Sequence, residues 1–133
     1  MRQITKFVAI AAMVVFGVNC GGGSEPNDPE PGNLTVALTA TPNNDDAAIK
    51  LRIIAPVAPS AITAAAGLQV FLNGPIGTST TVVVTGDMTA GPLLTLTVPD
   101  TRKADDYSAS VLQVASTTYA LRGVTGYALT VDK

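Results

Sequence analysis

The fold is decided by residues 34–53, which read LTVALTATPNNDDAAIKLRI. Every second residue is large and apolar from Leu34 to Leu38, and the same alternation returns from Ile49 to Ile53. A period of two places alternate side chains on opposite faces of an extended chain, so each part predicts a half-buried strand. Between the two parts, Pro42 precedes four consecutive Asn and Asp residues, which are typical of a turn.

The same pattern continues to the end of the chain. Further strands are expected at residues 68–72, 80–85, 93–98, 107–115, 119–122 and 127–131. Residues 107–115 carry apolar side chains on both faces, which predicts a central strand, whereas the alanine-rich residues 61–67 predict a crossover with one helical turn. Residues 34–133 are therefore predicted to form an all-β domain, a single antiparallel β-sandwich of seven or eight strands. Its core is expected to include Tyr107, Tyr119 and Tyr127, each with its hydroxyl at the edge.

Two segments of this domain resemble a known class of module. Residues 82–99 read VVVTGDMTAGPLLTLTVP, with two glycines separated by four residues between strands, and residues 107–114 follow the pattern Y-x-A-x-V-x-x-V. Both resemble cohesin-like and bacterial immunoglobulin-like modules. The resemblance implies a role in adhesion, assembly or scaffolding rather than catalysis.

The first nineteen residues have the organisation of a signal peptide. Arg2 and Lys6 precede an uncharged apolar stretch, residues 7–18, which is too short to span a bilayer as a helix. Cys20, the only cysteine, follows at once, and the segment resembles a bacterial lipoprotein signal. The resemblance implies that Cys20 is lipidated and becomes the first residue of the mature chain. Gly17 and Asn19 stand where such signals usually have leucine and a small residue, so secretion without lipid and a retained anchor remain alternatives.

Residues 20–33 are predicted to be a tether between the lipid and the domain. They contain three prolines, three acidic residues, four glycines and no large apolar side chain, so they cannot form a packed element. The protein is expected in the cell envelope, bound to a membrane through Cys20. By the same resemblance, Gly21 favours the outer membrane or cell surface.

Composition excludes several kinds of chemistry. The chain has no histidine, which removes the usual catalytic triads and the commonest ligand of transition metals. Phosphate-binding glycine loops are also missing, so neither catalytic nor cofactor-binding residues are assigned and the protein is predicted not to be an enzyme. After Cys20 there are six basic and ten acidic residues, a net charge of −4 without a basic cluster, which argues against nucleic acid.

The order of the predicted strands suggests one candidate metal site. If each strand crosses the sandwich once, the turn at residues 41–47 and the loop at residues 99–106 lie at the same end. Together with Asn43 and Asn44, these segments carry the carboxylates of Asp45, Asp46, Asp100, Asp105 and Asp106. Calcium prefers six to eight such oxygens, so a calcium site is a hypothesis here, against the alternative that these are ordinary turn residues.

The sequence therefore predicts a lipid-anchored envelope protein that acts as a non-enzymatic interaction or adhesion module for a protein or glycan. One alternative is a structural subunit of an envelope complex that pairs through an exposed strand edge. Another is a small hydrolase that depends on an aspartate.

Overall fold

The computed structural model describes residues 27–40, 43 and 45–133. The predicted signal peptide, Cys20 and Asn44 lie outside the described residues. Among the described residues are nine strands and one short 3₁₀ helix, η1. Their bounds are Gly32–Ala40 (β1), Asp46–Ile54 (β2), Ala61–Ala64 (β3), Gln69–Asn73 (β4), Ser79–Thr85 (β5), Gly91–Val98 (β6), Thr101–Asp106 (η1), Ser108–Ser116 (β7), Leu121–Arg122 (β8) and Ala128–Asp132 (β9).

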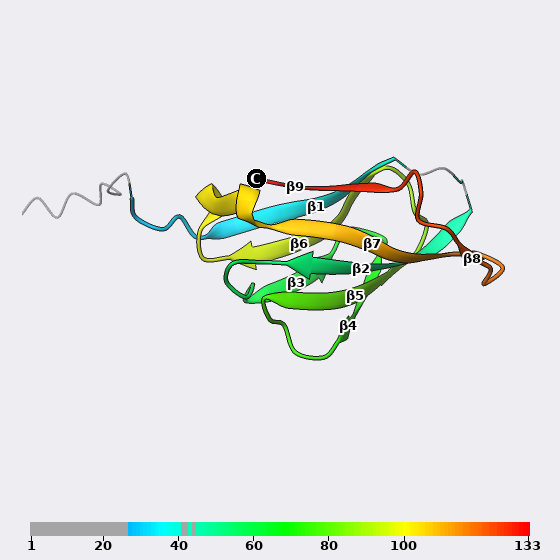
Figure 1. Cartoon of the computed structure of the whole chain (residues 1–133), viewed down its shortest axis with the longest axis horizontal. Coiled ribbons are helices and arrows are strands. Elements are labelled where there is room, and N and C mark those ends of the chain that lie inside the picture. The colour runs from blue at the N-terminus through cyan, green and yellow to red at the C-terminus, as the bar shows by residue number, and fades with distance from the viewer. Residues whose placement is uncertain (1–26, 41–42, 44) are drawn as a thin grey trace, which may run out of the picture.

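The strands form two antiparallel sheets that pack face to face, which confirms the predicted β-sandwich. The four-stranded sheet has the order β3-β6-β1-β9, and the five-stranded sheet has the order β4-β5-β2-β7-β8. Figure 1 shows the two layers and the long axis that they share. Because β1 and β2 belong to different sheets, the turn between them crosses from one layer to the other.

The core lies between the layers and consists mainly of aliphatic side chains. The alternating residues predicted from β1 and β2 are all buried, with Leu34, Val36, Ile49 and Leu51 completely inaccessible. The other buried apolar side chains are Ala55, Ile62, Val82, Val84, Met88, Leu93, Leu94, Leu96, Val98, Tyr107 and Val114. Burying a side chain of this kind stabilises the fold by about 1.5–3 kcal/mol relative to leaving it exposed, so these positions define the sandwich.

The predicted crossover at residues 61–67 is wrong, because Ala61–Ala64 form β3. This strand pairs with β6 along its whole length, and Ile62 is buried on the inner face. Backbone pairing and the burial of Ile62 outweigh the weak helix preference of the alanines, since seven residues cannot hold a helix alone. β3 is also the strand that raises the number from eight to nine.

β7 differs from the predicted central strand in one respect. It pairs with β2 along its length, but its other edge is paired with β8 only at Val114 and Ala115. Its register against β2 shifts after Val111, so that Leu112 is an extra residue and is exposed. The apolar residues on both faces therefore reflect a β-bulge rather than burial on both sides.

Tyr119 corrects the prediction that all three tyrosines pack in the core. Tyr107 is buried and Tyr127 is half-buried, whereas Tyr119 is 91% exposed. It was predicted to begin the strand at residues 119–122, but it lies in the hairpin between β7 and β8, which starts only at Leu121, and it has a positive φ of 65°. No helix among the described residues is long and apolar enough to cross a membrane.

Candidate interaction surface

The five aspartates of the hypothetical calcium site do not come together. β6 runs antiparallel to β1, with Val98 opposite Gly32, so the loop after β6 lies at the start of β1. Asp45 and Asp46 follow the end of β1, at the opposite end of the sandwich. The additional strand β3 explains the difference: one more crossing moves the 99–106 loop to the other end. In the part of the chain that the structure describes, no three acidic residues lie close enough together to hold a metal ion.

At the end of the sandwich that carries the β1–β2 turn, Asp45 and Asp46 bind an arginine and a tyrosine. The carboxylate of Asp46 is fully buried and accepts hydrogen bonds from the Arg122 guanidinium and the Tyr127 hydroxyl. Asp45 pairs with the same guanidinium, with 2.7 Å between Arg122 Nη2 and Asp45 Oδ1. Asn43 Nδ2 donates to the Tyr127 hydroxyl at 3.1 Å. Burial, followed by the bond to Asp46, raises the pKa of Tyr127 above its usual value. These contacts join the β1–β2 turn to β8 and to the segment before β9.

At the other end, Asp100 organises η1. Its side chain caps the helix by accepting from the Arg102 backbone N–H at 3.1 Å, and it also accepts from Arg102 Nε at 3.0 Å. The hydrogen bond from the Arg102 side chain holds the pKa of Asp100 well below its usual range. Asp105 and Asp106, at the end of η1, are exposed. Asp100 therefore acts as an N-cap and ion-pair partner.

The N-terminal segment is attached at the η1 end. The Thr101 N–H donates to the Glu30 carbonyl at 2.8 Å, and the Glu30 N–H donates to the Asp100 carboxylate at 3.2 Å. Lys133, the last residue, pairs with the Glu30 carboxylate at 2.8 Å. Residues 27–31 were predicted to belong to the tether, but Glu30 is held on the sandwich by these contacts. The N-terminal segment and the C-terminus thus share one end of the molecule, which we call the anchor end (Figure 1).

The hairpin between β7 and β8 lies at the opposite end, which we call the far end (Figure 1). Ser116 Oγ accepts from the backbone N–H groups of Thr118 and Ala120 at 3.3 and 3.1 Å. These bonds hold Tyr119 in its left-handed conformation, which is unfavourable for a bulky residue. Tyr119 and Leu121 are 91% and 67% exposed, more than any other large hydrophobic residue described.

A broader surface adjoins this hairpin on the outward side of the five-stranded sheet, which we call the outer face. Its residues alternate with the buried ones, so Ala48, Lys50 and Arg52 of β2 point away from the core. The strand register forms two neighbouring rows across the sheet. One row is Gln69, Thr85, Ala48, Ala115 and Leu121, and the other is Phe71, Val83, Lys50 and Gln113.

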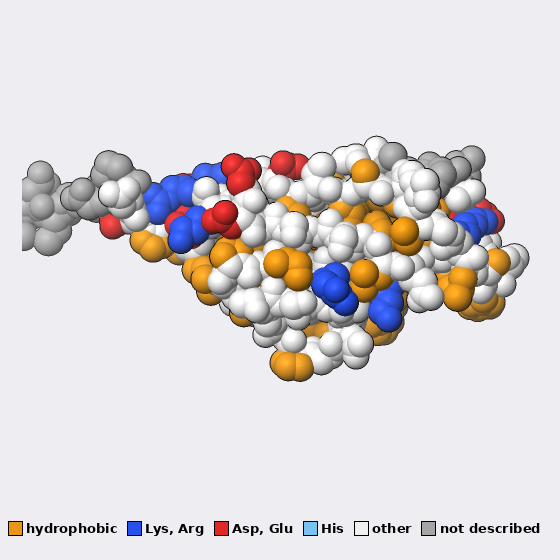
Figure 2. Space-filling model, viewed as in Figure 1, with side chains coloured by type: hydrophobic (Ala, Val, Ile, Leu, Met, Phe, Trp, Pro, Cys, Tyr) orange, Lys and Arg blue, Asp and Glu red, His pale blue; other side chains and the backbone are white. Residues whose placement is uncertain are grey.

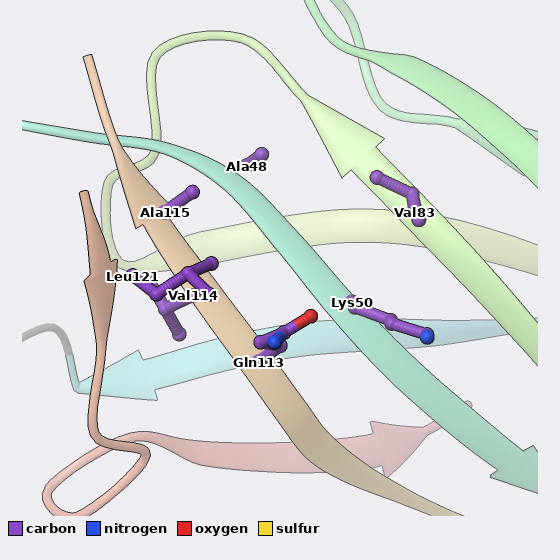
Figure 3. Close-up of a pocket in the computed structure, with 7 residues that line it drawn as sticks. All are labelled: Ala48, Lys50, Val83, Gln113, Val114, Ala115 and Leu121. Carbon is purple, nitrogen blue, oxygen red and sulfur yellow. The ribbon is translucent and has the colours of Figure 1, made fainter. Parts of the chain in front are cut away.

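A shallow pocket lies where these rows meet β8 (Figure 3). Its volume is about 120 Å³, and its lining is mostly apolar. Ala48 and Ala115 leave space between β2 and β7, while Leu121 closes one side. Lys50 and Gln113 supply an ammonium and an amide. This arrangement can bind a group by apolar contact and charge, and no carboxylate lines it.

The outer face is basic although the domain is acidic. Lys50 and Arg52 form no ion pair with any residue that the structure describes, whereas Arg102, Arg122 and Lys133 are all paired. The outward positions of the five strands include no Asp or Glu. Figure 2 shows basic side chains beside hydrophobic ones over this part of the molecule, with no acidic side chain among them.

Sequence reasoning missed this surface because the alternation in residues 48–52 assigns Lys50 to a solvated face without showing its neighbours. Ala48 and Ala115 are 67 residues apart in the chain and become adjacent only by pairing. The one feature of the sequence that could have indicated an interaction surface was Phe71, an aromatic residue at an outward position of a strand without charged residues.

Comparison with known proteins gives no relative: no family model, curated protein or solved structure matches the chain.

Proposed function

We propose that this protein is a lipid-anchored envelope protein that acts as a non-enzymatic interaction module. In this proposal, Cys20 carries the lipid and the polar segment after it gives the domain reach. The far-end hairpin and the adjoining outer face make the contact with a partner.

The observation that carries this proposal is the placement of two features at opposite ends of the sandwich. Asn27 and Glu30 are bound at the anchor end, through the Arg102 guanidinium and through η1 and Lys133. Tyr119 and Leu121 are the most exposed large apolar side chains and lie at the far end. A domain held at one end presents its other end to its surroundings, and exposed aromatic and aliphatic groups are typical of contact surfaces.

Anchoring is tested by the intact mass of the protein recovered from its native envelope, beside a Cys20→Ala variant. We expect a mature chain that begins at Cys20 and carries acyl groups, and release of the variant from the membrane fraction. An unmodified chain, or cleavage at another residue, would contradict the anchor.

Contact is tested by photo-crosslinking on intact cells. A benzophenone amino acid replaces Tyr119 or Leu121, and in the control it replaces Thr95, which lies on the outward side of the four-stranded sheet. We expect a discrete crosslinked product from positions 119 and 121 and none from position 95. Equal products from all three positions would contradict a specific contact at the far end.

A second candidate function, the structural subunit, is favoured by the edge strand β4. It has no charged residue, its outer edge is unpaired in the described structure, and Phe71 and Leu72 are 55% and 42% exposed. Such an edge can pair with a strand of another protein. Leu72→Lys would place a charge on this edge, far from β8. If the variant loses a partner that co-purifies in gentle membrane extracts, while crosslinking from position 121 persists, β4 carries an interaction of its own.

A further inference from the structure

Building on the proposed interaction role, we propose that the outer face binds an acidic protein segment. This segment inserts one aliphatic side chain into the pocket between β2, β7 and β8 and places a carboxylate against Lys50.

The size of the pocket selects a single side chain. An apolar cavity of about 150 Å³ holds one benzene molecule, whereas sites for cofactors and drug-sized ligands occupy about 300 Å³ or more. The pocket has a volume of about 120 Å³ and is bounded by the methyl groups of Ala48 and Ala115 and the side chains of Val83 and Leu121. It therefore has room for a branched aliphatic group such as that of leucine. An anchor side chain in a small pocket is a common centre of protein–protein contacts.

The charge of the outer face selects an acidic partner. Lys50 lines the pocket, and Arg52 lies two residues along the same strand on the same side. Neither has a counter-ion among the described residues, and no acidic side chain occupies an outward position of this sheet. Elsewhere the domain is negatively charged, so an acidic partner is attracted to this face and repelled by the rest.

The walls of the pocket favour a protein over a glycan. Sugar-binding sites combine ring stacking with many hydrogen bonds, but the polar groups of this pocket are only an ammonium and an amide. Phe71, the aromatic residue of the outer face, belongs to β4, with β5 between it and Ala48 and both β5 and β2 between it and Ala115. Apolar contact beside two positive charges instead suits a peptide in which one aliphatic residue is flanked by acidic residues.

The test uses the full chain in a non-ionic detergent and a fluorescein-labelled peptide, GEDELEDEG, followed by fluorescence anisotropy at low salt. Two matched peptides replace the leucine with alanine or every acidic residue with lysine. We expect saturable binding of the first peptide. The peptide without the leucine side chain should bind with an affinity reduced at least about ten-fold, and the basic peptide should not bind. Binding should also weaken as salt is raised.

Variants locate the site. Lys50→Glu is expected to lower the affinity about five-fold, because an attraction becomes a repulsion. Lys103→Glu makes the same charge change on η1, where Lys103 is exposed, and should leave the affinity unchanged. Ala115→Leu fills the pocket and should remove the preference for the leucine peptide, whereas Ala37→Leu on the four-stranded sheet should not.

Three results would overturn the proposal: no preference for the acidic leucine peptide over the other two, equal effects of Lys50→Glu and Lys103→Glu, or a dimer of the chain that Lys50→Glu dissociates. The last would assign the face to a second copy. None of these results bears on the mass of the envelope protein, so a failure here is distinguishable from a failure of the anchoring proposal.

Discussion

At the residue scale, buried Asp46 is the most consequential polar side chain at the far end. Its carboxylate is inaccessible and is satisfied by Arg122 and Tyr127, whereas Asp45, its neighbour, is half exposed and binds the same arginine from outside. Breaking the hydrogen bonds of a buried carboxylate lowers the free energy of unfolding more than breaking those of an exposed one, because water cannot replace the lost bonds.

We therefore expect Asp46→Ala to destabilise the protein by about 3 kcal/mol, since it removes the buried acceptor that the Tyr127 hydroxyl and the Arg122 guanidinium share. Asp45→Ala serves as the control and should cost about 0.5 kcal/mol, as for an exposed ion pair. Urea unfolding at neutral pH measures both. Equal losses for the two variants would contradict the assigned roles.

The Arg102 side chain lowers the pKa of Asp100 in the folded protein, which makes stability depend on pH. A carboxyl group with a lowered folded-state pKa stabilises the fold above its unfolded-state pKa of about 4, and this contribution is lost as the pH falls towards the folded-state pKa. Asp100→Asn keeps an N-cap but removes the charge. We expect the variant to be less stable than the wild type at pH 7 and the difference to shrink below about pH 4.

The measurement is the urea midpoint of each protein at neutral and acid pH. Asp105→Asn is the control, because this residue of η1 is exposed. A wild-type advantage over Asp100→Asn that stays constant from pH 7 to pH 2 would show that charge does not underlie the effect.

At the element scale, the short strand β3 decides which loops meet. It adds one crossing of the sandwich, and every later connection changes ends as a result. The five aspartates that would share one end in an eight-strand arrangement are divided between two ends. Asp45 and Asp46 bind Arg122 at one end, and Asp100 binds Arg102 at the other. A four-residue element thus changes the chemistry available at both ends.

The turns between elements give a prediction of their own. Gly86 has a φ of 132°, and a Cβ there would lie 2.7 Å from Leu68 Cδ2 and 3.0 Å from the Gly67 carbonyl oxygen. Gly74 also has a positive φ, 94°, but open space around it. We expect Gly74→Ala to cost about 1 kcal/mol through backbone strain alone, and Gly86→Ala about 2–3 kcal/mol because crowding is added.

Thermal or urea unfolding of the two glycine variants compares a strained site with a strained and crowded one. A loss at Gly74 that equals the loss at Gly86 would show that the contact with Leu68 is relieved without cost.

At the scale of the whole molecule, the C-terminus and the first described residues, 27–31, lie at the anchor end, and the exposed apolar hairpin lies at the far end (Figure 1). This polarity predicts where additions are tolerated. A peptide tag after Lys133 should leave crosslinking from position 121 unchanged. The same tag inserted between Thr118 and Tyr119 should abolish it, because it separates the residues that Ser116 holds together.

Circular dichroism and the unfolding midpoint control for folding of the two tagged proteins. Loss of crosslinking from the C-terminally tagged protein, with its fold intact, would mean that the partner also covers the anchor end.

The sequence by itself determined the class of fold and most of the core. The period of two in residues 34–38 and 49–53 defines which side chains are buried, because successive side chains of a strand point to opposite faces. The turn residues between strands likewise follow from local backbone preferences. These are local properties, and the structure bears them out in β1 and β2.

Only the tertiary structure decided the register, the end at which each loop lies, and the outer-face pocket. Local propensity predicts a crossover at residues 61–67, whereas pairing with β6 makes Ala61–Ala64 a strand. The predicted placement of the five aspartates at one end depended on that crossover and was wrong for the same reason. Ala48, Ala115 and Leu121 become neighbours through backbone pairing between distant segments, to which no local signal corresponds. Non-local pairing is a property of the whole sandwich, and for that reason the candidate interaction surface was visible only after the strands were in register.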